Sequence, residues 1–198
     1  MEKLAKKFEK SILPELKKAC GKKNISEVPK LKKVVVSAGV GDFKEDDKAI
    51  DKIVSDIAKI TGQKPKINHS RKAVSAFKLR IGQPVGVTVT LRGELMFDFI
   101  ERLINIALPR VRDFRGLPEK SFDGKGNFSL GIKEHTIFPE IKYEDVTLNF
   151  GFEVNVNTSA KNNEDAHALL LALGFPFEKK EVRKVAVAEK EINEGEKE

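Results

Sequence analysis

The chain has 198 residues, of which 40% are apolar, enough for one domain of ordinary size with a real core. Its longest apolar stretch, residues 95–108, is interrupted by four polar side chains, whereas a membrane-spanning helix needs about 20 mostly apolar residues. The charged N-terminus has no apolar signal core behind it, and the single cysteine, Cys20, excludes an internal disulfide and a cysteine metal cluster. We therefore expect a cytoplasmic protein that needs no membrane, metal or cofactor.

The net charge of +7 is distributed unevenly along the chain. Residues 1–33 hold 11 Lys/Arg against 4 acids, and residues 57–93 hold 8 Lys/Arg and no acid at all. The acid-free run cannot neutralise itself with internal ion pairs, so it is predicted to face a polyanion. The alternative is a solvated basic face that serves only solubility.

Periodicity predicts helices and strands in the first half of the chain. Residues 3–19 carry apolar side chains at intervals of four, a helical spacing that Pro14 disturbs. Residues 31–38 are β-branched and strand-like. A helix with acids in its first turn follows, and Gly62 ends it. Residues 68–80 then form a mobile basic loop between two strands.

The second half continues with alternating and helical patterns. We expect a strand at 85–92, a largely buried helix at 94–108 that Pro109 ends, a long loop at 113–130, a strand at 147–157 and a helix at 163–173. These elements predict an α+β fold, with a mainly antiparallel sheet, helices packed on one face and a polar RNA-binding face on the other. Residues 1–179 form a single domain. Residues 180–198 are a charged extension, disordered or a frayed helix.

No constellation for catalysis is present. The three histidines, His69, His135 and His167, do not have the spacing of a zinc site, and no GxSxG motif occurs. Gly39-Val40-Gly41 lies between a strand and a helix, but Lys44 stands where a nucleotide-binding loop would have its third glycine. A face rich in Thr, Asn, Ser and Gly instead suits close approach of a sugar-phosphate backbone, although antiparallel sheets often have a merely solvated face.

Several motifs resemble, in order and over about residues 3–179, the bacterial L-five family of large-subunit ribosomal proteins. They are Gly39-Val-Gly41, Thr61-Gly-Gln-Lys-Pro65, Arg71 to Arg80, Val89-Thr-Leu-Arg-Gly93, Pro109-Arg-Val-Arg-Asp-Phe-Arg-Gly116, Ser121-Phe-Asp-Gly124, Phe138-Pro-Glu-Ile141 and Phe175-Pro-Phe177. The resemblance implies a non-enzymatic constituent of the large subunit that binds 5S ribosomal RNA and helps attach it in the central protuberance.

The resemblance also implies partners and site residues. The partners are 5S and 23S ribosomal RNA, peptidyl-site transfer RNA, the small-subunit head protein S-thirteen, to which an intersubunit bridge forms, and other central-protuberance proteins. The 5S RNA would be held by Lys33, Ser37, Gln63, Lys64, Thr88, Thr90 and Arg92. The transfer RNA would meet the loop residues Arg71, Lys72, Ser75, Lys78 and Arg80. The bridge is assigned to Arg112, Arg115, Lys120 and Lys125.

The chain departs from the family pattern at one position of the predicted RNA face, where Ser37 replaces the usual Asn. A serine hydroxyl still donates and accepts, so one hydrogen bond is in question. Two other functions stay open: a basic RNA-binding regulator outside the ribosome, and an enzyme on a small α+β scaffold.

Overall fold

The computed structural model describes residues 4–22, 24–43, 46–142, 144 and 146–178. Its helices are α1 (Leu4–Lys7), α2 (Leu13–Ala19), α3 (Asp47–Thr61), α4 (Gly93–Arg102), α5 (Leu108–Arg110) and α6 (Asn163–Ala172). Its strands are β1 (Leu31–Gly39), β2 (Lys66–His69), β3 (Pro84–Leu91), β4 (Phe128–Ile132) and β5 (Phe152–Thr158). The extension 180–198 lies outside the described residues.

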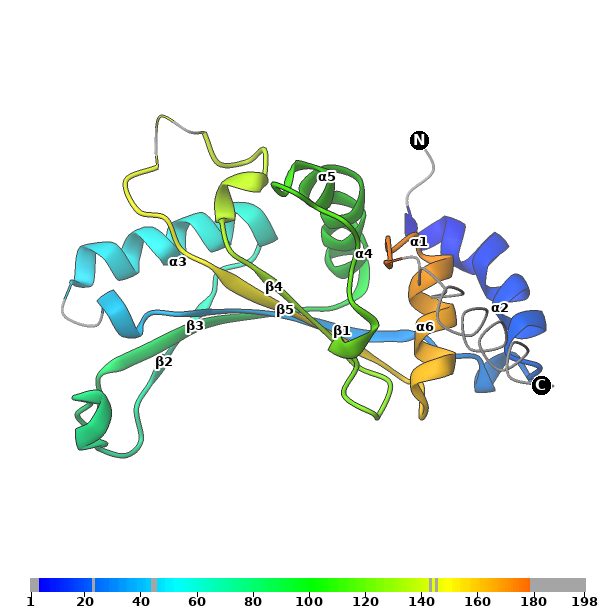
Figure 1. The fold of residues 1–198 in the computed structure, drawn as a ribbon, viewed down its shortest axis with the longest axis horizontal. Helices are drawn as coiled ribbons and strands as arrows, with labels where there is room; N and C mark the ends of the chain where they lie inside the picture. Colours follow the sequence, from blue (N-terminus) through cyan, green and yellow to red (C-terminus); the bar gives the residue numbers. More distant parts are fainter. Residues whose placement is uncertain (1–3, 23, 44–45, 143, 145, 179–198) are drawn as a thin grey trace, which may run out of the picture.

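The five strands form one antiparallel sheet in the order β2-β3-β1-β5-β4. The long strand β1 lies at its centre, paired with β3 on one side and β5 on the other. Helices α3 and α4 cover one face (Figure 1), and among the described residues no helix or strand covers the centre of the other. The α+β architecture expected from the sequence is thus confirmed, with α3 and α4 on a single face of the sheet.

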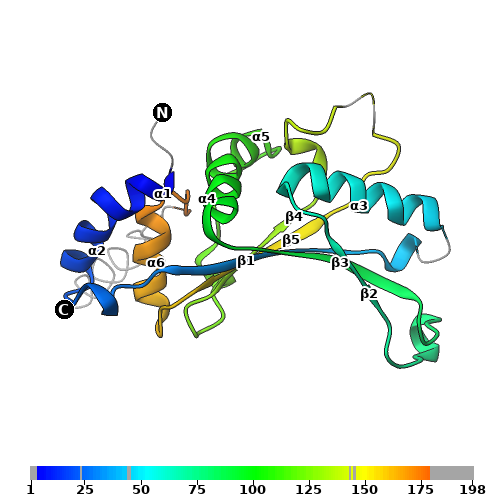
Figure 2. The same ribbon diagram turned by 180° about the vertical axis from the view of Figure 1, so that it is seen from behind.

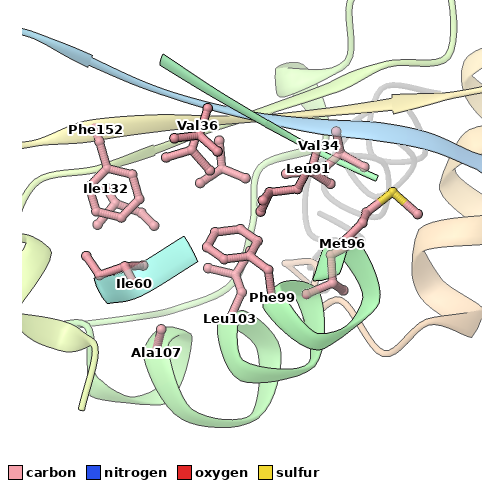
Figure 3. Close-up of a cluster of buried hydrophobic side chains, with 14 of the residues drawn as sticks. Val34, Val36, Ile60, Leu91, Met96, Phe99, Leu103, Ala107, Ile132 and Phe152 are labelled. Atoms are coloured by element: carbon pink, nitrogen blue, oxygen red, sulfur yellow. The ribbon is translucent and has the colours of Figure 1, made fainter. Parts of the chain in front are cut away.

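The core lies between the sheet and α3 and α4. Alternate residues of β1 and β3 are less than 3% exposed and point toward the helices: Val34, Val36, Ala38, Val87, Val89 and Leu91. Figure 3 shows part of this set and Phe152 meeting Met96, Phe99 and Leu103 of the α4 segment and Ile60 of α3. Burying each such side chain stabilises the fold by about 1.5–3 kcal/mol. The strand alternation therefore fixes which side chains remain on the uncovered face.

A second group of helices closes one end of the sheet. α2 packs against α6, with Lys22 Nζ 2.9 Å from an Asp165 carboxylate oxygen, and Phe8 meets Phe97 of α4 with ring centroids 5.7 Å apart. The chain after α6 returns to the body, where Phe177 pairs with Leu117 in a parallel bridge. None of the described helices has both the length and the apolar character needed to cross a membrane.

Both proline-containing helices have a widened turn immediately before the proline. A π-turn at Phe8–Ile12 joins α1 to α2 ahead of Pro14, and another at Leu103–Ala107 joins α4 to α5 ahead of Pro109. Proline has no N–H to donate the usual helical hydrogen bond to the residue four positions earlier, and a π-turn accommodates the missing bond. The predicted end of this helix at residue 108 was therefore wrong by two residues, because Pro109 lies inside α5 and the helix ends at Arg110.

Three strand predictions need correction. β5 begins at Phe152, not at 147, because its neighbours stop there: Ile132 pairs with Phe152, and Ser37 pairs with Glu153. β4 lies partly inside the region predicted as a loop, since residues 128–130 belong to it. β3 begins at Pro84 and ends at Leu91, one residue before each predicted bound.

Candidate nucleic-acid interface

The uncovered side of the sheet, here called the open face, carries the outward side chains of all five strands. The strand register aligns them in rows across the sheet. One row runs Lys66, Thr88, Ser37, Glu153 and Gly131. The next runs Thr90, Val35, Asn155 and Ser129. Apart from Val35, these side chains are polar or absent, so the face offers hydrogen-bonding groups on a flat surface.

Two glycines leave parts of the open face without projecting side chains, although the fold does not require glycine at either position. Gly39 and Gly131 are exposed, have no positive φ, and a Cβ atom added to either would meet nothing within 4 Å. Gly86, opposite Gly39, is different, because its Cβ would lie 3.1 Å from the carbonyl oxygen of Ala38. The backbone at Gly39 and Gly131 is therefore open to a close approach from outside.

Charge divides the open face into two halves. The half formed by β2, β3 and β1, here called the basic half, carries Lys33, Lys66 and, just past β3, Arg92. The other half, β5 and β4, carries Glu153 and neutral groups that bond to one another, such as Ser129 Oγ donating to Asn155 Oδ1 at 2.6 Å. A polyanion would favour the basic half.

The structure brings the seven residues predicted for 5S RNA to this basic half and its edge. Lys33, Ser37, Thr88 and Thr90 belong to the open face of β1 and β3. Arg92 follows β3 and donates from Nη1 to the carbonyl oxygen of Lys32 at 3.4 Å. Gln63 and Lys64, both exposed, follow the left-handed Gly62 that caps α3 and lead directly into the edge strand β2.

Sequence reasoning missed two side chains of the same surface, Lys66 and Asn68 of β2. Lys66 pairs with Thr88 across the strands, and the Asn68 amide donates from Nδ2 to Thr88 Oγ1 at 3.1 Å. The alternation of side chains that would have placed them on this face was hard to detect, because β2 has only four residues. Lys59, by contrast, lies in the acid-free run but is 3.6 Å from buried Asp56, so that cation is already paired.

The residues predicted to meet transfer RNA all lie in the β2–β3 connection, residues 70–83, here called the hairpin tip. Arg71, Lys72, Ser75, Lys78 and Arg80 lie there on the surface. Local hydrogen bonds lie within the tip: Ser70 Oγ donates to the Lys72 carbonyl at 2.6 Å, and Arg80 N–H donates to Gln83 Oε1 at 2.8 Å, while the mobility expected from the sequence stays a prediction. Figure 2 shows the tip projecting beyond the sheet, away from α3.

The four residues predicted for the intersubunit bridge do not share one location. Arg112 and Arg115 follow α5 on the helix side and are exposed. Lys120 is in a 3₁₀ turn, Glu119–Ser121. Lys125 belongs to a turn next to the open face, where the Asn157 amide donates to Asn127 Oδ1 at 3.4 Å. The segment therefore presents its cations in two directions.

The histidines do not form a reactive site. His135 is fully buried and stacks on Phe150 with ring centroids 4.1 Å apart, and burial lowers its pKa against the opposing effect of Asp56. His167 packs on Phe177 at the other end of the molecule, with centroids 4.5 Å apart. Within the ranges that the structure describes, no three His, Cys, Asp or Glu side chains gather to hold a metal ion.

Comparison with known proteins agrees with the motifs. Residues 24–80 match the family model for ribosomal protein L5, and residues 84–177 match the model for the C-terminus of the same ribosomal family. Proteins named large ribosomal subunit protein uL5 are similar along nearly their whole length. The one from Halothermothrix orenii is 49% identical over 177 residues, 89% of this chain and 99% of the relative. The one from Synechocystis is 52% identical over 170 residues, 86% of this chain and 94% of the relative. The chain therefore belongs to the ribosomal protein L5 family.

Proposed function

We propose that this protein holds 5S ribosomal RNA in the large ribosomal subunit through the basic half of its open face. Its family consists of structural ribosomal proteins and not of enzymes, so the chain is a constituent of the large subunit in the cytoplasm. The finer claim, that 5S RNA is the ligand and this face the contact, rests on the surface itself together with the family resemblance.

The observation that carries the proposal is that cations and a flat polar surface coincide. Thr90 is exposed between two buried neighbours, Lys66 of β2 and Lys33 of β1 lie diagonally from it on the adjacent strands, and Gly39 leaves backbone uncovered. Double-stranded RNA is recognised mainly through phosphates and 2′-hydroxyls on a wide, shallow groove. A flat surface with hydroxyl, amide and ammonium groups matches those ligands better than a deep pocket would.

Further contacts belong to the same proposal. The hairpin tip, with its exposed Arg71, Lys72, Lys78 and Arg80, is assigned to peptidyl-site transfer RNA. Arg112 and Arg115, on the helix side, are assigned to the intersubunit bridge with S-thirteen, whereas Lys125 borders the open face and fits the RNA better. Contacts with 23S RNA and with other proteins of the central protuberance follow from a place in that part of the subunit.

The test is the salt dependence of 5S RNA binding, measured by fluorescence anisotropy with the full chain. Each lost phosphate contact reduces the slope of log K against log salt by about 0.7–0.9. Lys33→Gln/Lys66→Gln is therefore expected to lower the slope by about 1.4–1.8, since two contacts are removed. Lys48→Gln/Lys142→Gln is the matched control, because both lysines are exposed and neither belongs to a strand of the sheet, Lys48 lying on α3. Equal slopes in the two double variants would contradict the proposal.

A further inference from the structure

The connection between β4 and β5, residues 133–151, places a buried polar cluster against α3. Figures 1 and 2 show this connection beside α3, on the helix side of the sheet. The side chains of His135 and of Asp56 on α3 are 0% and 2% exposed, and His135 Nε2 lies 4.0 Å from Asp56 Oδ2. Buried polar groups are normally hydrogen-bonded. Among the described residues, however, Asp56 Oδ1 and both ring nitrogens of His135 have no hydrogen-bond partner.

The Asp56 carboxylate already faces two cations of its own helix. Lys52 Nζ and Lys59 Nζ each lie 3.6 Å from Asp56 Oδ1, one turn before it and one turn after it. On the connection itself, the neighbouring Lys133 and Glu134 are exposed to solvent. A proton on the His135 ring would therefore add a third cation beside one buried carboxylate.

Burial keeps the His135 ring neutral. It lowers the pKa of His135 from the ordinary 6.5, and the charge of Lys52 acts in the same direction. Asp56, the Phe150 backbone and the Asn149 side chain favour the protonated ring, although the last two do not reach hydrogen-bond geometry with it. A ring that reaches water is protonated more readily than one held in this cluster. Acid therefore favours conformations in which His135 leaves its buried position.

The β4–β5 connection is attached to the body at two places of different chemistry. His135 stacks on Phe150, with ring centroids 4.1 Å and ring planes 14° apart, so this contact joins the two ends of the connection. Between these ends, Phe138 is fully buried against α4, and Glu140 forms an ion pair with Arg102 of the same helix. The second attachment contains no histidine. The first attachment can therefore open while the second one holds.

We propose that His135 and Asp56 form an acid-sensitive latch, in which protonation of the ring releases the ends of the β4–β5 connection from α3 while the sheet and its helices stay folded. The middle of the connection remains attached through Phe138. Local openings of this kind need less free energy than global unfolding, because they expose little buried surface. The latch is separate from the open face and does not depend on the proposed RNA contact.

The test is limited proteolysis of the full chain with an endoproteinase that cleaves after glutamate. Cleavage after Glu134 requires the residues on both sides of the bond, His135 included, to enter the protease in an extended conformation. When opening is fast relative to cleavage, the cleavage rate follows the population of the open form. Between pH 7 and pH 5 this population can rise at most about 25-fold, because the released ring takes up its proton with the ordinary pKa of 6.5.

His135→Gln is the matched control for this measurement. Glutamine does not titrate, so this variant reports how the protease itself responds to pH. From pH 7 to pH 5, the cleavage rate after Glu134 should rise severalfold more in the parent than in the variant, with a limit of about 25-fold. His135→Phe, which keeps a ring against Phe150, provides the same comparison if His135→Gln does not fold.

Urea distinguishes release of the latch from global unfolding. Sensitivity to denaturant scales with the surface exposed, so sub-denaturing urea should hardly change cleavage after Glu134 but should accelerate cleavage after Glu101, which lies within α4. The inference is overturned if the parent and the neutral variants respond equally to pH. It is also overturned if urea accelerates cleavage at both sites equally, because release would then require the whole domain to unfold.

Discussion

Thr88 and Thr90 lie on the same face of β3 but differ in their hydrogen bonding. The Thr88 hydroxyl accepts a bond from Asn68 at 3.1 Å, whereas within the described part of the chain no side-chain hydrogen bond engages Thr90. Thr90 is also exposed and Thr88 is half-buried. Of the two hydroxyls, that of Thr90 is the one available to RNA.

We therefore predict that Thr90→Val weakens 5S RNA binding more than Thr88→Val does. Valine is nearly isosteric with threonine and favours strands, so neither change should unfold the domain. An RNA group left without its partner costs about 1–3 kcal/mol, or roughly 5- to 150-fold in affinity. Filter binding and thermal melting of both variants check this. Parent-like binding by Thr90→Val would remove Thr90 from the contact.

His135 makes stability depend on pH. Burial lowers its pKa from the ordinary 6.5, an effect larger than the opposing attraction of Asp56, whose Oδ2 lies 4.0 Å from Nε2. The folded state therefore keeps this ring neutral below pH 6.5, where the unfolded chain takes up a proton. The contribution of His135 to the free energy of unfolding is fully present above pH 6.5 and is lost as the pH falls from there toward the folded-state pKa.

The expected slope from this one group is at most about 1.4 kcal/mol per pH unit. His135→Phe removes the titration and keeps a ring stacked on Phe150, so its free energy of unfolding should vary less between about pH 7 and pH 5. Urea unfolding at several pH values measures the difference. If parent and variant lose stability equally in that window, His135 is not the group responsible.

At the scale of elements, adding a side chain at a glycine of the open face tests whether RNA lies against that part of the sheet. Gly39→Val places a side chain where nothing lies within 4 Å of the new Cβ, at a φ that valine accepts, so the strand should be as stable or more so. If RNA lies against the basic half, the added bulk costs about 1–3 kcal/mol, or roughly 5- to 150-fold in 5S affinity.

Gly131→Val on β4 is the control for that change. Gly131 is equally unobstructed but pairs with Glu153 in the other half of the face. The Gly131→Val variant should therefore bind 5S RNA nearly as well as the parent. Equal losses in both variants would mean that the RNA covers the whole sheet, and no loss in either would mean that it lies elsewhere.

Elements with long, regular patterns were predictable and short ones were not. α3 was recognised by its acids and by Gly62, and the structure adds that Asp46 accepts hydrogen bonds from the N–H groups of Lys48 and Ala49 at its start. β2 and β4 have four and five residues, too few for alternation to distinguish them from loop. The first bound of β5 depends on where its neighbours end, which local sequence does not contain.

For the molecule as a whole, charge along the sequence was a better guide than any single motif. The acid-free run 57–93 folds into the end of α3, all of β2 and β3, and the hairpin tip between them. The family resemblance already implied that this run supplies two separate surfaces, which in the structure are the basic half and the hairpin tip. The sequence did not show that the predicted bridge residues diverge, because their positions depend on how the loops cross the sheet.

The central claim is that the basic half of the open face contacts 5S RNA in the assembled ribosome. The most direct measurement is photocrosslinking from a benzoylphenylalanine placed at Thr90, followed by sequencing of the attached RNA. The same probe at Leu171, 57% exposed on α6 and off the sheet, is the control. We predict that 5S RNA is recovered from position 90 and is depleted at position 171. Recovery of 23S or transfer RNA alone from position 90, or of no RNA there, would contradict the account.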